Sequence, residues 1–416
     1  MLAQLVTGFS SGLPLLLTGS TLQAWLKDSQ VSLEAIGLFA LVGLPYTLKF
    51  VWSPTFDRFV LPFLGRRRGW MLVLQLALVL VIGLFGCLNP GAHPYAVALA
   101  AIIVTLFSAS QDIVLDAYRR EALSDSEIGL GAAIFVNGYR VAMLVSGALA
   151  LFLADTMSWQ SVYFLMAGLM GVGILATLAI TEPKVDAPPP RSMREAVALP
   201  FVDFFSRRGA LLALAFILLY KIGDQMANSM TTPFVLELGF SKTELAAVSK
   251  FFGLGAMIVG GFVGGLLMLR VGIIRALWLF GIAQAVTTLA YAVLAQTGRN
   301  MGVLAMATTV TSLAWGMGSV AQTAYMASLT NKRFSATQFA LLSSLMGVPR
   351  VIASAPTGYL AHQLGWIGFF VFCTVIAVPG LFLLGQLTAR GPKFMEPAPP
   401  KPEVTSWAAE QAAAVE

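Results

Sequence analysis

The stretch YAVALAAIIVTLFSASQDIVLDAYRRE, Tyr95 to Glu121, combines a long apolar run with two aspartates near its end. Its length fits a helix that crosses a membrane, because about 20 apolar residues span the hydrocarbon core of a bilayer. A charged side chain near the centre of such a helix costs roughly 2.5–3.5 kcal/mol on insertion scales. The two carboxylates, Asp112 and Asp116, therefore need ionic partners or a wet cavity, and they are candidates for function.

Apolar runs of similar length recur along the whole chain. Of its 416 residues, 57% are hydrophobic and only 11% are charged, whereas an ordinary soluble domain carries about 25% charged residues. Lipid offers the backbone no hydrogen-bond partners, so the spans are expected to be helices and the fold all-α. The sequence thus predicts a polytopic membrane protein. Apolar windows and helix breakers give twelve spans, at about 2–25, 33–55, 70–88, 95–118, 130–154, 159–180, 210–236, 243–269, 272–296, 301–326, 335–361 and 365–388.

Basic residues in the connections predict the orientation of these spans. The even-numbered connections and the C-terminal tail hold eighteen Lys and Arg residues, and the odd-numbered connections hold three. Since basic loops stay in the cytoplasm, both termini are expected there. The net charge of +6 is concentrated in these short loops. It therefore indicates contact with the bilayer, and we expect no nucleic-acid partner.

The two halves of the chain resemble each other weakly. Three pairs of residues recur at offsets of 207 or 210 positions: Arg140 with Arg350, Glu34 with Glu244, and Trp159 with Trp366. Matches at nearly one offset indicate a six-plus-six duplication in which both halves keep the same topology. This is the parallel-repeat plan of major facilitator transporters, whose substrate sites lie between the halves near the midplane of the membrane.

The predicted organisation follows from this repeat. An N-terminal six-helix bundle is expected at 1–182 and a C-terminal six-helix bundle at 210–390. Between them, 183–209 reads as a cytoplasmic linker with a short interfacial helix, because aromatic residues there stand beside basic ones. The proline-rich tail, 391–416, is expected to be disordered. Each chain would hold its own substrate pathway between its two bundles, so we expect a monomer.

Eight ionisable residues fall inside the predicted spans. Unpaired, they would cost roughly 20–28 kcal/mol in total, more than the usual net stability of a fold. They must therefore face one another, a wet cavity, or both. Helical spacing agrees, because Ser108, Asp112 and Asp116 fall within about 80° on one helix face. The eight are Lys49, Asp112, Asp116, Arg140, Lys221, Asp224, Lys250 and Arg350.

Structural and functional interpretations of these charges remain open. Lys221 and Asp224, three residues apart, could neutralise each other, and Asp116 could pair with Arg119 or Arg120 at the cytoplasmic interface. Asp112 lies deeper and is the stronger candidate for function. The excess of cations indicates an anionic solute. The acids indicate coupling to protons, since a buried carboxyl can load a proton on one side of the membrane and release it on the other.

Other classes of chemistry find little support in the sequence. Both histidines, His93 and His362, fall in predicted loops, and neither cysteine lies near a charged motif. We therefore expect no metal site, no cofactor other than the coupling proton, and no enzymatic activity, since an enzyme would need a convergent set of nucleophile, base or metal ligands. The chain lacks the phosphate-binding pattern GxxxxGK[ST], so transport driven by ATP hydrolysis is not expected.

The loop DRFVLPFLGRRRGW, 57–70, resembles the loop between the second and third spans of major facilitator proteins. The family usually places one residue between the D-R pair and the following glycine, and this chain has six. The resemblance implies a cytoplasmic charge clamp, and ordinary positive-inside residues are the alternative. The expected cytoplasmic gate residues are Asp57, Arg58, Arg66, Arg67, Arg68 and Arg119.

Longer stretches resemble the AmpG muropeptide permeases of Gram-negative bacteria. They are GFSSGLPLLLTGSTLQAWL, LVGLPYTLKFVWSP, GRRRGW, SASQDIVLDAY, GYRVAMLVSG, YKIGDQMANSMTTPF and FSATQFALLSSL. The resemblance implies an inner-membrane importer, driven by the proton-motive force, of N-acetylglucosaminyl-1,6-anhydro-N-acetylmuramic acid with or without its peptides. It also implies a link to β-lactamase induction. The alternative is a proton symporter of another anionic metabolite or an oligosaccharide.

The resemblance also implies roles for individual residues. Proton coupling is expected at Asp112, Asp116 and Asp224. The expected substrate-binding residues are Tyr46, Lys49, Gln111, Asp112, Arg140, Lys221, Asp224, Asn228 and Arg350.

Overall fold

The structure is a computed structural model that describes the chain except for residues 32–38, 184–188, 348–352, 354–355 and 391–416. Within the described residues, ten helical segments are long and apolar enough to cross a membrane. They correspond to ten of the twelve predicted spans. The other two predictions, 33–55 and 335–361, include residues outside the described part, as does the predicted tail. Between 33 and 55 the structure describes a shorter apolar helical stretch, Leu41–Val51.

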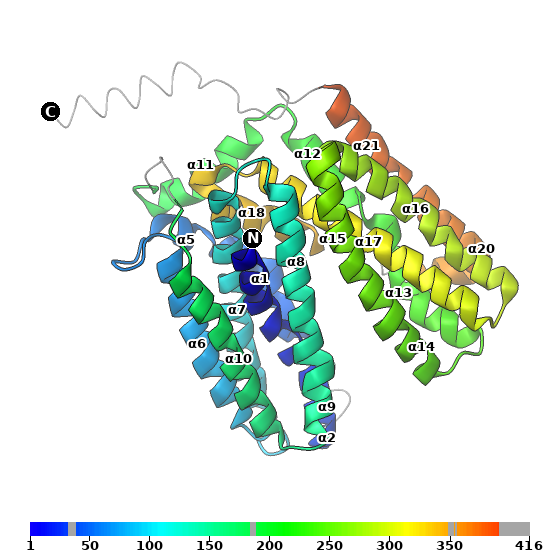
Figure 1. Cartoon of the computed structure of the whole chain (residues 1–416), viewed down its shortest axis with the longest axis horizontal. Coiled ribbons are helices and arrows are strands. Elements are labelled where there is room, and N and C mark those ends of the chain that lie inside the picture. Colours follow the sequence, from blue (N-terminus) through cyan, green and yellow to red (C-terminus); the bar gives the residue numbers. More distant parts are fainter. Residues whose placement is uncertain (32–38, 184–188, 348–352, 354–355, 391–416) are drawn as a thin grey trace.

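The helices form two bundles that follow the order of the sequence (Figure 1). The first contains α1 (Leu2–Leu17), α2 (Ser20–Asp28), α4 (Leu44–Leu48), α5 (Pro54–Arg58), α6 (Arg68–Gly86), α7 (Pro94–Ala122), α8 (Ile128–Leu144), α9 (Ala150–Ala154) and α10 (Trp159–Ala179). The second contains α12 (Ala210–Leu219), α13 (Ile222–Glu237), α14 (Lys242–Val248), α15 (Gly255–Val271), α16 (Ile273–Thr297), α17 (Met301–Leu329), α18 (Ser335–Leu345), α20 (Thr357–Val375) and α21 (Val378–Ala389). The linker helix α11 (Met193–Phe205) contacts α5, α12 and α18.

Several spans are interrupted where the sequence suggested continuous helices. The first is divided into α1 and α2 at Thr18–Gly19, and the seventh into α12 and α13 at Tyr220–Lys221. Gly365 (φ 64°) breaks α20, which agrees with the predicted boundary before the last span. Such interruptions near the middle of a membrane helix occur at transporter binding sites, because they free polar groups inside the bilayer.

Small residues bring the two bundles together along α8 and α15. A Cβ atom added at Gly265 would lie 2.2 Å from Cβ of Ala133 on α8, and one at Gly261 would lie 2.6 Å from Oδ1 of Asn137. On the opposite face of α15, Gly260 and Gly264 lie against α17. The glycines of α15 thus serve close helix packing within one chain.

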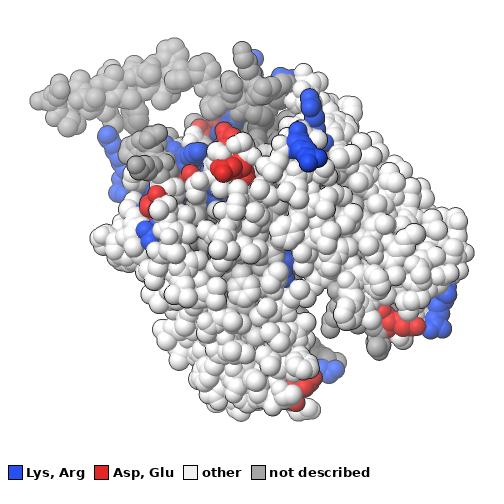
Figure 2. Space-filling model, in the orientation of Figure 1, with Lys and Arg blue, Asp and Glu red and all other residues white. Residues whose placement is uncertain are grey.

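Charged side chains at the surface collect near the ends of the molecule (Figure 2). The band between these ends is almost free of them on the visible face, as expected for a surface in contact with lipid. The same view shows a notch between the two bundles at the end opposite α11 and α18.

Candidate functional site

Asp112 and Asp116, one turn apart on α7, have different partners. Both are nearly buried, with 9% and 8% of their surface exposed. Asp116 Oδ1 lies 2.9 Å from Arg119 Nη2, and its Oδ2 lies 3.9 Å from Lys49 Nζ. Asp112 instead accepts a hydrogen bond of 2.5 Å from Ser11 Oγ on α1. Among the ion pairs of the described residues none includes Asp112, so its charge is the less compensated of the two.

Polar contacts between α1, α4 and α7 surround this carboxyl. Gln111 Nε2 donates to Ser10 Oγ at 2.6 Å. Tyr46 on α4 donates to Ser108 Oγ at 2.9 Å. The polar face predicted for the fourth span is therefore packed against other polar groups inside the first bundle. Sequence reasoning missed Ser10 and Ser11, although two adjacent serines in an apolar helix, as in GFSSGLP, are the pattern by which they could have been found.

A second cluster of charge lies where the two bundles meet. Arg140 Nη1 donates to the carbonyl of Met257 on α15 at 2.6 Å. Lys221, at the interruption between α12 and α13, donates to Ser319 Oγ at 2.6 Å. Both cations lie over the ring of Trp315 on α17, with Lys221 Nζ 4.2 Å and Arg140 Cζ 5.6 Å from its centroid. Trp315, which sequence reasoning missed, thus joins cations from both halves of the chain.

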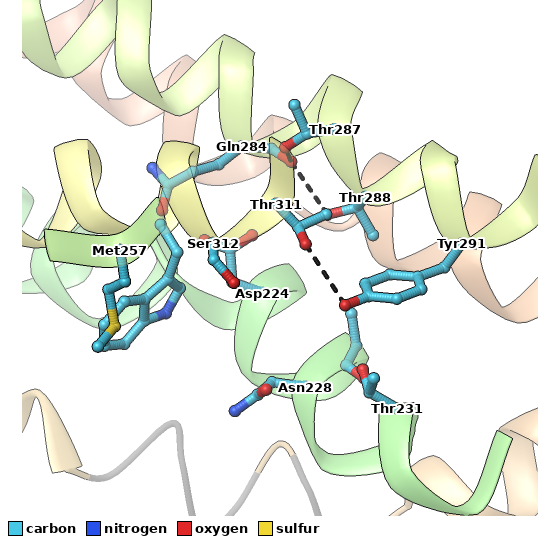
Figure 3. Close-up of a pocket in the computed structure, with 12 residues that line it drawn as sticks. Asp224, Asn228, Thr231, Met257, Gln284, Thr287, Thr288, Tyr291, Thr311 and Ser312 are labelled. Atoms are coloured by element: carbon cyan, nitrogen blue, oxygen red, sulfur yellow. Dashed lines mark hydrogen bonds between the residues drawn. The ribbon is translucent and has the colours of Figure 1, made fainter. Parts of the chain in front are cut away.

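Asp224 does not pair with Lys221 in the described structure. No ion pair within 4.0 Å joins the two residues. Asp224 Oδ2 is buried and has no hydrogen-bond partner. Asp224 also belongs to the lining of a pocket of about 630 Å³, including its open mouth, between α13, α15, α16 and α17. Figure 3 shows Asp224, Asn228 and Ser312 on one side of this space and Thr288 and Tyr291 on the other.

One end of the molecule is closed by a buried ionic network. Arg67 pairs with Asp57 at 2.8 Å and with Glu121 at 2.5 Å, and none of these three side chains has more than 1% of its surface exposed. Across the bundle boundary, the backbone N–H and hydroxyl of Thr337 donate to Asp57 Oδ2 at 2.8 and 2.7 Å. Ser335 Oγ donates to Glu121 at 2.5 Å. The network therefore ties the first bundle to the N-terminus of α18, where a carboxylate is favoured by the helix dipole.

Electrostatics keep Arg67 charged in this setting. Burial alone would lower its pKa, but the carboxylates of Glu121 and Asp57 outweigh that effect and raise the pKa above its ordinary value. A buried arginine with two carboxylates is a stable arrangement only while all three groups are present, because each unpaired charge would be costly to bury.

The other predicted gate residues have different roles in the structure. Arg66 donates to Asp57 and, at 2.9 Å, to the carbonyl of Arg333 beyond the bundle boundary. Arg119 lies over Phe339 of α18, 5.3 Å from the ring centroid. Arg68 donates to the carbonyls of Thr177 and Leu178 and so stays within its own bundle. Arg58 lies over the ring of Phe59, away from the network. Of the remaining predicted residues, Arg350 is outside the described residues and the side chain of Lys250 is not described.

Comparison with known proteins identifies the family. The model of the Major Facilitator Superfamily matches residues 1–354. The anhydromuropeptide permease of Escherichia coli K12 is 46% identical over 382 residues, which cover 91% of this chain and 78% of the relative. The chain is an AmpG-family member of the major facilitator superfamily.

More distant relatives agree with this assignment. A protein of Rickettsia felis named putative transporter AmpG 4 is 35% identical over 92% of this permease and 95% of its own length. Among solved structures, the proton:xylose symporter XylE has a TM-score of 0.71 at 10% identity and covers 92% of this chain and 94% of its own. The human organic anion transporter MFSD10 has a TM-score of 0.62 at 16% identity, with 92% and 96% covered. At these identities the two structures support the fold alone.

Family membership settles the class of this permease. Major facilitator proteins are multi-pass membrane transporters of small molecules and are not enzymes. In this fold the substrate is bound between the two bundles, which rock about it. Asp112, which forms no ion pair, the cations around Trp315 and the pocket at Asp224 all lie toward the middle of the spans, away from the closed end.

Proposed function

We propose that this permease imports anhydromuropeptides, N-acetylglucosaminyl-1,6-anhydro-N-acetylmuramic acid and its peptide derivatives, across the bacterial inner membrane. The observation that carries the substrate class is the 46% identity to the anhydromuropeptide permease of Escherichia coli. The position of Arg140 and Lys221 supports it. Both cations lie at the bundle boundary, where an arginine or lysine can bind the carboxylates of a peptide.

Protons are proposed as the coupling ion, and Asp112 as the principal coupling group. A buried carboxylate without a cationic partner can exchange a proton, whereas one held by two cations stays ionised. Asp112 is of the first kind, and Asp116, with Lys49 and Arg119, is of the second. Asp224, which also lacks an ion pair, is a second candidate, and Asp116 contributes by holding the cations near Asp112.

The closed end is proposed to face the cytoplasm. The ionic network at Arg67 lies among the basic connections that the positive-inside rule assigns to the cytoplasmic side, together with both termini. The substrate pathway would then open to the periplasm in this conformation. We propose that the permease acts as a monomer and that imported muropeptides contribute to induction of β-lactamase.

Uptake into proteoliposomes tests this function. Labelled N-acetylglucosaminyl-anhydro-N-acetylmuramic acid is expected to accumulate when a proton gradient is imposed and to leak back when an ionophore removes it. Unlabelled muropeptide should compete, and liposomes without protein serve as the control. Gradient-driven uptake of an unrelated organic anion that muropeptides do not inhibit would favour the alternative, symport of another anionic metabolite or oligosaccharide. Uptake indifferent to the gradient would exclude proton coupling.

A further inference from the structure

The pocket in the second bundle is lined mainly by neutral polar side chains, and Asn228, Ser312 and Trp315 bring hydrogen-bond donors to it. It lies between α13, α15, α16 and α17, and threonines contribute much of its wall. Thr231, Thr288 and Thr311 each donate their only hydroxyl proton to a carbonyl of their own helix, at 2.9, 3.0 and 2.6 Å. The oxygens of Thr231 and Thr288 are therefore left to the pocket as acceptors, whereas that of Thr311 already contacts the Tyr291 hydroxyl at 3.4 Å.

Two further acceptors in the wall are buried and unpartnered. They are Oδ2 of Asp224 and Oε1 of Gln284. The orientation of the Gln284 amide is fixed, because its Nε2 donates to the carbonyl of Phe280 at 3.1 Å. A buried acceptor without a donor costs roughly 1–3 kcal/mol. Both oxygens are buried beneath the pocket surface, so the groups that face a ligand are the other hydroxyls and amides of the lining.

Charge in the same wall disfavours an anionic ligand. Asp224 is the one ionisable acid of the lining, and the lining contains no lysine or arginine. Lys221 lies nearby, but its ammonium donates to Ser319 Oγ and to the carbonyl of Trp315. A carboxylate in the pocket would meet the like charge of Asp224 and no cation of the lining, which is repulsive in a site of low dielectric constant.

Aromatic rings complete the pocket. Trp315 and Tyr291 belong to the lining, and Trp315 is held in place by the cations Lys221 and Arg140. Flat rings beside polar groups suit a ligand with both C–H faces and hydroxyls, as a pyranose has. The 630 Å³ includes open solvent at the mouth, but the cavity itself, about 170 Å³, is still larger than a bare ion needs.

We propose that this pocket is the saccharide subsite of the permease and binds an uncharged N-acetylated sugar ring through its hydroxyl and amide protons. Peptide carboxylates are excluded from it and bind elsewhere in the central cavity. This inference rests on the proposed function. It adds that the pocket shown in Figure 3 holds the sugar part of the substrate and that the peptide binds outside it.

Binding to purified protein in lipid nanodiscs tests the subsite. The probes are a neutral disaccharide of two β-1,4-linked N-acetylglucosamines, a muropeptide, and the acidic stem peptide alone, each titrated calorimetrically. Thr311→Val removes one lining hydroxyl, together with its contact to the Tyr291 hydroxyl, with little change of shape and should weaken both sugar-containing probes about five- to tenfold. Thr309→Val is the matched control. Thr309 is on the same helix, is half-buried and donates to its own helix at 2.7 Å, but is not part of the lining.

Thr288→Val provides a second pocket variant in case Thr311→Val folds poorly. Muropeptide binding by the wild type with no difference between the pocket variants and Thr309→Val would overturn the subsite and leave the proposed function intact. Weakened binding of the stem peptide alone would overturn it as well. If ligand binding requires sodium rather than choline in the buffer, and the threonine variants lose this requirement, the pocket is an ion site. Failure of the wild type to bind any sugar-containing probe would overturn the proposed function together with the subsite.

Discussion

The closed end and the pocket in the second bundle differ in how their buried carboxylates are paired. At the closed end, Arg67 pairs with two carboxylates, and hydroxyl and N–H donors of α18 bind the same two carboxylates. In the pocket, the buried acceptors of Asp224 and Gln284 have no partner within the protein. The first arrangement stabilises one conformation of the protein itself. At the closed end it is arginine nitrogens, such as Nη1 of Arg66, that lack a partner, whereas in the pocket a carboxylate oxygen of Asp224 is left unpaired. The pairing of the carboxylates therefore distinguishes the two regions.

The largest expected effect comes from breaking the closed end. Arg67→Met leaves Asp57 and Glu121 buried without their cation, which should destabilise the closed end by about 3–5 kcal/mol. The measurement is the alkylation rate of a cysteine introduced at the buried Thr330, in a protein whose exposed Cys87 has been replaced. Alkylation should become much faster than in the parent protein.

Arg68→Met is the matched control for that experiment. Arg68 binds carbonyls of its own bundle, so its loss should leave alkylation at position 330 unchanged. Equal rates in Arg67→Met and the parent protein would mean that the network does not hold the end closed.

The next effect separates the two aspartates of α7. Asp112→Asn should abolish accumulation driven by a membrane potential, which is worth about 2.3 kcal/mol, or about 45-fold, per charge at 100 mV. Substrate binding should remain, because the amide still accepts from Ser11. Asp116→Asn instead removes the partner of Lys49 and Arg119, and should lower the melting temperature of the protein. Normal accumulation by Asp112→Asn would place the coupling group elsewhere.

A smaller effect tests whether packing as well as charge joins the bundles. Gly265→Val forces a side chain against Ala133 of α8 and should cost about 1–3 kcal/mol. Thermal unfolding in detergent and alkylation at position 330 both report on it. Gly255→Ala, where an added Cβ meets nothing within 4 Å, should change neither. If Gly265→Val changes neither the unfolding temperature nor the alkylation rate, the ionic network is sufficient on its own to hold the bundles together.

The smallest expected effect on stability comes from the exposed turn between Ser124 and Glu127. Its charge is in contact with water, unlike the charges of the closed end and the pocket. The Ser124 hydroxyl and backbone N–H donate to Glu127 and lower the pKa of that carboxyl below its usual 4.5. The resulting stabilisation is present above the usual pKa and is lost as the pH falls through the lowered value. Glu127→Gln should therefore reduce the melting temperature slightly at pH 7 and not at pH 3. Equal small decreases in melting temperature at pH 7 and pH 3 would rule out the charge of Glu127 as the cause.

Much of the fold could be predicted from hydropathy. Ten of the twelve predicted spans coincide with described membrane-length helices, since apolar length is a local property of the sequence. The eighth span contains two overlapping GxxxG patterns, a sign of close helix packing, and the structure places their glycines at such contacts: Gly260, Gly261, Gly264 and Gly265. The interruption at Lys221 was missed, because a break between apolar stretches leaves no mark in a hydropathy window.

The sequence by itself determined which residues carry charge inside the membrane and that they must find partners. It could not determine which partners, because Asp112 and Asp116 share one helix face and one motif. Only the tertiary structure decided that Lys49 and Arg119 lie beside Asp116 while Ser11 lies beside Asp112. The pocket threonines were missed for the same reason: a threonine in an apolar helix satisfies its proton locally, and only the packing of four helices shows that its oxygen faces a shared space.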